Sequence, residues 1–167
     1  MKTRITTAAA VALLAMTLTV PVSASTTSSY QSVFVEPYGG PVQSPFDCPP
    51  GMSCGSGTIS GLGHIASQSI VFGDCGFGCH LRTVIFADGS VLLIREVQPA
   101  PFRSPGAAGA HGYIGFGLPG NPQFADVTQT IVGGTGRFAG ATGGGTARVK
   151  IAGGVAIIKG SGTITLD

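Results

Sequence analysis

The chain has 167 residues, including 28 glycines and only 10% charged residues, and its formal net charge is +2. This length suits one domain with a single core. Nucleic acids and anionic membrane surfaces are held by dense basic patches, which this charge balance does not supply. We therefore expect no nucleic acid and no membrane among its partners.

The first 24 residues have the layout of a secretory signal peptide. Lys2 and Arg4 form a basic start, residues 8–20 are apolar, and Val22-Ser23-Ala24 is a small-residue cleavage site. The apolar run is short for a membrane span, and a retained anchor is the alternative. Cleavage removes Lys2 and Arg4 and leaves equal numbers of acidic and basic residues. We therefore expect a secreted, extracellular protein with a neutral mature chain.

Residues 25–53 are rich in Ser, Thr and Pro, which predicts a disordered N-terminal arm with at most one edge strand at Val33-Phe34-Val35. From residue 54 to residue 167 the composition is typical of β-structure. Asp88-Gly89 is a hairpin turn signal between two apolar runs, and no run beyond the signal peptide has a helical period. We expect strands at 58–61, 65–72, 80–87, 90–97, 111–116, 124–132, 146–151 and 155–166. The chain is thus predicted to form one all-β domain.

The four cysteines predict two disulfides, because an exported chain meets an oxidising compartment. The pairs Cys48–Cys54 and Cys75–Cys79 would each close a short loop that contains Gly or Pro. A hairpin of the first two predicted strands would also bring Cys54 near Cys75, so that pairing stays open.

The cysteines and histidines also allow a metal site. Cys75, Cys79, His80 and a remote His64 or His111 could bind zinc, but export favours the disulfide. We therefore expect no metal.

The segment 133–143, GGTGRFAGATG, is a glycine-rich corner that reverses one strand into the next. We expect Phe138 to point inward and Arg137 to stay in water. Residues 134–139 also fit a dinucleotide-binding fingerprint, but no predicted helix follows, and Asp167 is the only acidic residue downstream. We therefore expect no cofactor.

An internal repeat accompanies this corner. Gly55-Ser56-Gly57-Thr58-Ile59 recurs as Gly160-Ser161-Gly162-Thr163-Ile164. Matching first and last strands would suit a sheet that closes on itself and hides its edges.

These segments, GGTGRFAGATG, GSGTISGLGHI and GSGTITL, resemble the allene-oxide-cyclase/dirigent-like β-barrel superfamily, in particular its secreted bacterial members. The resemblance covers residues 55–167. It implies a closed, antiparallel, eight-stranded, calycin-like barrel with an apolar lumen. Plant members are trimers that cyclise a fatty-acid epoxide or steer the coupling of phenoxy radicals, and some bacterial relatives cyclise polyketide-type products. The segment 99–110 and the cysteines set this chain apart.

The candidate site lies on the segment 91–97, VLLIREV. Successive residues of a strand face opposite sides, so either Arg95 or Glu96 must point into the barrel unless both lie at its rim in water. We take Glu96 and Arg95 as the candidate catalytic residues. Neighbouring strands supply candidate ligand-binding residues: Arg82, His80, His111 and Tyr113.

Apolar residues on both faces of 84–86 and 91–94 indicate that another subunit covers the outside, so we expect a homo-oligomer, a trimer or a dimer. The predicted function is to bind a small apolar molecule in the lumen and to guide its stereochemistry. One alternative is a cofactor-independent cyclase or isomerase acting on a lipid-like or polyketide-like substrate. Another is a structural or interaction protein whose barrel is filled by its own side chains.

Overall fold

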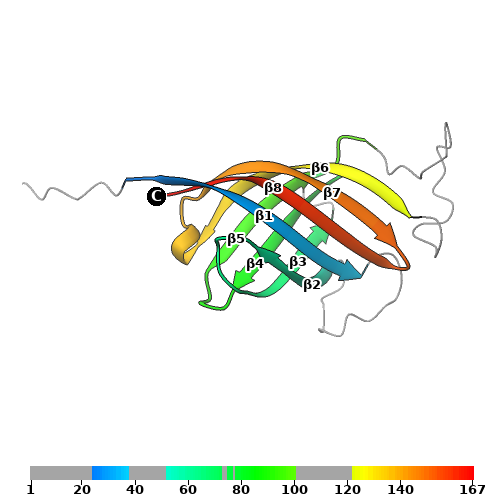
Figure 1. The fold of residues 1–167 in the computed structure, drawn as a ribbon, viewed down its shortest axis with the longest axis horizontal. Helices are drawn as coiled ribbons and strands as arrows, with labels where there is room; N and C mark the ends of the chain where they lie inside the picture. The colour runs from blue at the N-terminus through cyan, green and yellow to red at the C-terminus, as the bar shows by residue number, and fades with distance from the viewer. Residues whose placement is uncertain (1–23, 38–51, 73–74, 77, 101–121) are drawn as a thin grey trace, which may run out of the picture.

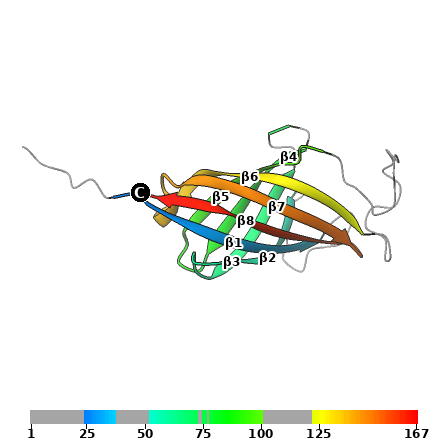
Figure 2. The same ribbon diagram turned by 45° about the horizontal axis from the view of Figure 1, so that its top comes forward.

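The computed structural model describes residues 24–37, 52–72, 75–76, 78–100 and 122–167. Its eight strands pair antiparallel in chain order, and the first also pairs with the last, which closes the sheet into a barrel (Figure 1, Figure 2). The predicted all-β closed barrel is thus confirmed. The strands are β1 (Thr26–Pro37), β2 (Met52–Ile59), β3 (Ile65–Phe72), β4 (Cys79–Phe86), β5 (Val91–Val97), β6 (Gln123–Thr135), β7 (Thr142–Ala152) and β8 (Val155–Leu166).

Strand β1 occupies a segment that the sequence analysis assigned to the arm. Its alternate residues Tyr30, Ser32, Phe34 and Glu36 are buried, while the residues between them are exposed. The strand pairs with β8 along its whole length, so it is neither an arm nor an edge. Serine and threonine are common on the solvent-exposed face of a strand. Their abundance in this segment hid the alternation of buried and exposed residues. The rest of the predicted arm up to residue 51, and the strand expected at 111–116, lie outside the described residues.

The internal repeat flanks β1 on both sides. Its first copy lies in β2 and its second in β8, and these two strands are the neighbours of β1 in the barrel. Val33 of β1, for example, is opposite Thr58 on one side and Lys159 on the other. The repeated segments therefore contribute to closure by holding the first strand between them.

The glycine-rich corner contains a short 3₁₀ helix at Gly136–Phe138. Phe138 is completely buried and packs against Phe86, with ring centroids 4.7 Å apart. A side chain at Gly134 would place its Cβ 2.0 Å from the carbonyl oxygen of Val91, so only glycine allows this approach of β6 to β5.

The Arg137 side chain is exposed, as predicted, and it covers the corner from outside. Its guanidinium lies 4.7 Å from the ring centroids of both Phe86 and Phe138 and donates a hydrogen bond to the carbonyl oxygen of Leu62. It also pairs with Asp88 at 3.5 Å. These contacts close one end of the barrel, which we call the corner end.

Because the strands alternate in direction, their connections alternate between the two ends. The opposite end, which we call the disulfide end, contains the start of β4 at Cys79 and the end of β1 at Pro37. Between the ends, buried apolar side chains from all eight strands form one core. Among the described residues, no helix is long and apolar enough to cross a membrane.

Candidate functional site

Strand β5 directs one of its two charged residues into the barrel. Glu96 is only 1% exposed, whereas Arg95 is exposed on the outer surface. Arg95 lies opposite Thr130 of β6 and Leu81 of β4 on that outer surface. The alternation of the strand therefore separates the two candidate catalytic residues, and only Glu96 reaches the interior.

Arg82 of β4 is the centre of the buried polar groups. Its side chain is fully buried and donates two hydrogen bonds to Glu96, from Nε to Oε1 at 3.1 Å and from Nη2 to Oε2 at 3.0 Å. Its Nη1 donates to Glu36 Oε2 at 3.3 Å and to the amide oxygen of Gln68. The face of the guanidinium lies over the ring of Phe34, 4.3 Å from the centroid. Every nitrogen of Arg82 thus has an acceptor inside the barrel.

A row of paired residues brings Tyr30 and Gln129 to the same carboxylate. Going around the barrel from Tyr30, the register passes through Gly162 and Gly145 to Gln129 and then to Glu96. The two glycines place no side chain in the row, so the Tyr30 hydroxyl can donate to Gln129 Oε1 at 3.3 Å. Gln129 Nε2 in turn donates to Glu96 Oε1 at 2.7 Å. This chain of hydrogen bonds orients the carboxylate of Glu96.

His80 continues the same row at the disulfide end. It pairs with Glu96 in the β4–β5 register, and its Nε2 lies 2.8 Å from Glu96 Oε2. The His80 side chain is 18% exposed, so it links the buried carboxylate to the surface. We refer to Tyr30, Glu36, Gln68, His80, Arg82, Glu96 and Gln129 together as the interior cluster.

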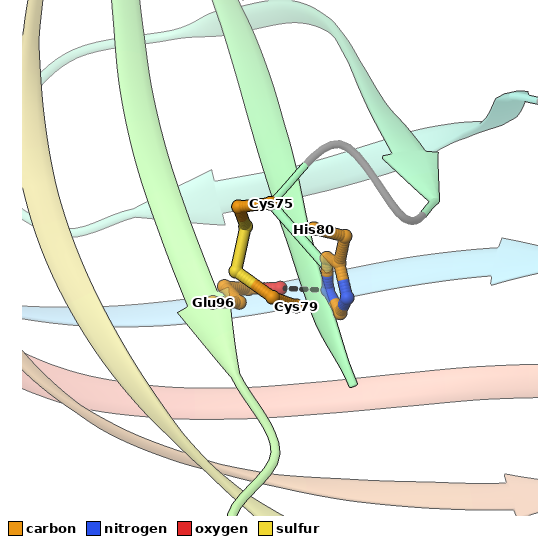
Figure 3. The surroundings of a disulfide bond; sticks show 4 residues. All are labelled: Cys75, Cys79, His80 and Glu96. Atoms are coloured by element: carbon orange, nitrogen blue, oxygen red, sulfur yellow. Dashed lines mark hydrogen bonds and ion pairs between the residues drawn. A yellow bond between two sulfur atoms is a disulfide. The ribbon is translucent and has the colours of Figure 1, made fainter. Parts of the chain in front are cut away.

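The disulfide Cys75–Cys79 directly precedes His80, and Figure 3 shows the three residues beside Glu96. This pairing confirms one predicted disulfide and rules out a bond between Cys54 and Cys75. Cys54 is also disulfide-bonded, and its predicted partner, Cys48, lies outside the described residues.

The two buried carboxylates have pKa values shifted in opposite directions. Burial alone would raise the pKa of Glu96, but the charge of Arg82 and hydrogen bonds from His80 and Arg82 lower it to about 2. Burial raises the pKa of Glu36, helped by the negative charge of Glu96 and opposed by Arg82 and Gln68. Glu96 is therefore ionised at neutral pH, and Glu36 is the group that more readily holds a proton.

The number of charges in the interior cluster also indicates that the cluster holds one extra proton. Two carboxylates, Glu36 and Glu96, face one guanidinium, that of Arg82. A proton on Glu36 or on His80 makes the cluster neutral. The cluster thus combines a buried ion pair with one further proton. A buried group that holds a proton next to an ion pair is suited to transferring that proton to a bound molecule.

Of the predicted site residues, the structure brings Glu96, Arg82 and His80 together, while His111 and Tyr113 lie outside the described residues. Four further members of the cluster are not among the predicted site residues. Glu36 and Tyr30 lie on β1, where the alternation at 30, 32, 34 and 36 could have revealed them. Gln68 and Gln129 are neutral amides, which no charge pattern reveals.

Within the described parts of the chain, no three His, Cys, Asp or Glu side chains are placed to share a metal ion. No protein-family model matches the chain, and searches of curated proteins and of solved structures give no significant match.

Proposed function

We propose that the barrel binds a small, largely apolar molecule whose polar group contacts the interior cluster at the disulfide end. The observation that carries this proposal is the burial of Glu36, Arg82 and Glu96 inside an otherwise apolar barrel. Burying charges is costly, and well-packed apolar residues of similar volume often serve stability equally well. A charged cluster in such a place is therefore a candidate for function.

The surroundings of the cluster fit an amphipathic ligand. Ile70 and Ile94 flank Arg82 on the neighbouring strands, and the ring of Phe34 covers its guanidinium. Two further buried polar atoms, Ser32 Oγ and Gln123 Oε1, have no hydrogen-bond partner among the described residues. Such atoms normally find a partner, and a ligand's hydroxyl or carbonyl group, or a water molecule, would supply one.

The route of entry follows from the two ends of the barrel. Phe138 and Arg137 cover the corner end. His80, at the disulfide end, is partly exposed and contacts Glu96. A ligand that enters at the disulfide end would meet His80 first.

The opposite pKa shifts of Glu36 and Glu96 favour a second candidate, a cofactor-independent cyclase or isomerase. Two carboxyl groups with different proton affinities are suited to acid–base roles. Protonated Glu36 would donate to an oxygen of the substrate, and Glu96, paired with Arg82 and His80, would stabilise the positive charge that develops. The resemblance of the corner segment to a superfamily that contains such enzymes agrees with this candidate.

Native mass spectrometry of the protein purified from its source tests the binding proposal. We expect a retained small molecule, released on denaturation, and saturable binding of cis-parinaric acid, a fluorescent apolar carboxylic acid. Arg82→Met should lose both, and Arg95→Met, which removes a cation from the outer surface, should lose neither. Absence of a retained molecule together with absence of probe binding would contradict the proposal.

Glu96→Gln and Glu36→Gln separate binding from catalysis. If the protein only binds, both variants should retain the molecule without chemical change. If it is a cyclase or isomerase, the retained molecule should be converted by the unaltered protein, and conversion should fall at least 100-fold in Glu36→Gln, as for loss of a general acid.

A further inference from the structure

The outer surface of the barrel has a chemistry that the interior cluster does not explain. Strands β6, β7, β8 and β1 lie side by side, coloured yellow, orange, red and blue in Figure 1. Arg148 of β7 is directly opposite Lys159 of β8, and Lys150 lies two residues further along the same face of β7. All three side chains are exposed. We call Arg148, Lys150 and Lys159 the basic cluster.

This basic cluster is poorly neutralised by the protein. Like charges directly opposite each other on a sheet are destabilising. Among the residues that the structure describes, the one carboxylate paired with the cluster is that of Asp126, whose Oδ1 lies 3.8 Å from Arg148 Nη1, and both side chains are more than half exposed. Such a pair contributes little to stability. An excess of positive charge therefore remains on this face.

Next to the basic cluster lies a field of hydroxyl groups. The row beside Arg148 and Lys159 contains Ser161, Thr146 and Thr128, and the following row contains Thr163 and Thr130 on either side of a glycine. These side chains are exposed, and no charged residue interrupts the two rows on β6, β7 and β8. We call these five residues the hydroxyl field.

We propose that this face is a binding site for an acidic polysaccharide. The carboxylates of such a polymer would pair with the basic cluster, and its hydroxyl groups would exchange hydrogen bonds with the hydroxyl field. The guanidinium of Arg148 also lies 5.1 Å from the ring centroid of Phe124, which restricts its orientation toward the polymer. This site is on the outside of the barrel and is independent of any ligand in its interior.

The test measures binding of the full protein to immobilised polygalacturonate, with dextran as the neutral polymer and polyphosphate as an anion without sugars. We expect binding to polygalacturonate that weakens as salt is added, because exposed charges are screened. Weaker binding is expected for polyphosphate and none for dextran.

Three variants separate the contribution of the basic cluster to binding from that of the hydroxyl field. Replacing the basic cluster together, as Arg148→Ser, Lys150→Ser and Lys159→Ser, should weaken polygalacturonate binding roughly tenfold or more, as for loss of a few weak ion pairs. Arg137→Ser, which removes an exposed cation that pairs with Asp88 at the corner end, should leave it unchanged. Thr128→Val with Thr146→Val should weaken binding of polygalacturonate and not of polyphosphate.

Equal binding of polyphosphate and polygalacturonate would overturn the assignment to a polysaccharide. Unchanged binding in the triple variant, with its melting temperature unaltered, would overturn the site. If the triple variant loses binding and its melting temperature also falls, a second variant that keeps the three positive charges decides. This variant, Arg148→Lys, Lys150→Arg and Lys159→Arg, should bind polygalacturonate as the unaltered protein does. Failure to bind would count against the proposal.

Discussion

Arg82 and Glu96 are diagonal neighbours on β4 and β5, and inside the barrel their side chains face each other through two hydrogen bonds of 3.1 and 3.0 Å. Both side chains are at most 1% exposed. The paired geometry, with two donors on one planar group and two acceptors on the other, is the strongest form of a buried ion pair.

Arg82→Met should destabilise the barrel by about 3–5 kcal/mol, because it leaves two carboxylates buried without a cation. Glu36 and Glu96 would then be protonated more readily, so the loss should shrink as the pH falls. Urea unfolding followed by circular dichroism measures the effect.

The matched control is Arg95→Met. Arg95 is on the outer surface of the same hairpin, and its replacement should change the free energy of unfolding by less than about 0.5 kcal/mol. Equal losses in the two variants would show that Arg82 does not stabilise the interior cluster.

Because the pKa of Glu96 is lowered to about 2, the free energy of unfolding should depend on pH in the acidic range. A carboxylate with a lowered pKa in the folded state stabilises the fold above the ordinary pKa of glutamate, and this contribution is lost as the pH falls toward about 2. We expect a loss of about 3 kcal/mol over that window, from the size of the shift. Unfolding free energies measured from pH 5 to pH 2 should show this slope, and Glu96→Gln should remove it. A slope of the same steepness in Glu96→Gln would assign it to other groups.

Glu36 should act in the opposite direction. Its raised pKa means that the folded state holds the proton more tightly than the unfolded state, so stability falls as the pH rises from the ordinary pKa of glutamate through the raised one. Glu36→Gln, which imitates the protonated group, should be at least as stable as the unaltered protein at pH 7. Its free energy of unfolding should also no longer decline as the pH rises above about 4.5. A Glu36→Gln protein that is several kcal/mol less stable at pH 7 would show that the ionised form is the native one.

The sequence predicted much of this fold from local patterns. Asp88-Gly89 placed the β4–β5 hairpin, and the period of β5 showed that one of Arg95 and Glu96 must face inward. The partners of Glu96 were harder to find. Glu36 lies 46 residues from Arg82 and on a strand whose Ser and Thr residues imitate a disordered arm. Which distant strands become neighbours across a barrel is set by closure, and no local pattern carries that information.

Phe138→Ala should cost about 3–5 kcal/mol, because it removes a fully buried ring and leaves a cavity against Phe86. Val132→Ala is the control. Val132 lies in β6 just before the corner but is 43% exposed, so its replacement should cost much less stability. Thermal melts of the two variants make the comparison. Similar melting temperatures would show that the corner does not anchor this end of the core.

Replacing Cys75 and Cys79 together by serine should lower the free energy of unfolding by about 2 kcal/mol, the loop-entropy value for so short a loop. The start of β4 would then be less restrained, so His80 should lose part of its contact with Glu96. The NMR chemical shifts of the His80 ring, compared at one pH in the variant and in the unaltered protein, test this. A loss of stability with unchanged His80 chemical shifts would show that the disulfide does not position His80.

The pairing of β1 with β8 has a consequence for biosynthesis. The hydroxyl groups of Thr27 and Thr165 are 2.7 Å apart in space and 138 positions apart along the chain. No arrangement of the earlier strands can complete the hydrogen bonds of β1 before β8 has been synthesised, so closure of the barrel must wait until β8 has left the ribosome. A chain cut short before β8 would present unpaired backbone on β1 and on β7 at once, and such a fragment should aggregate rather than remain partly folded.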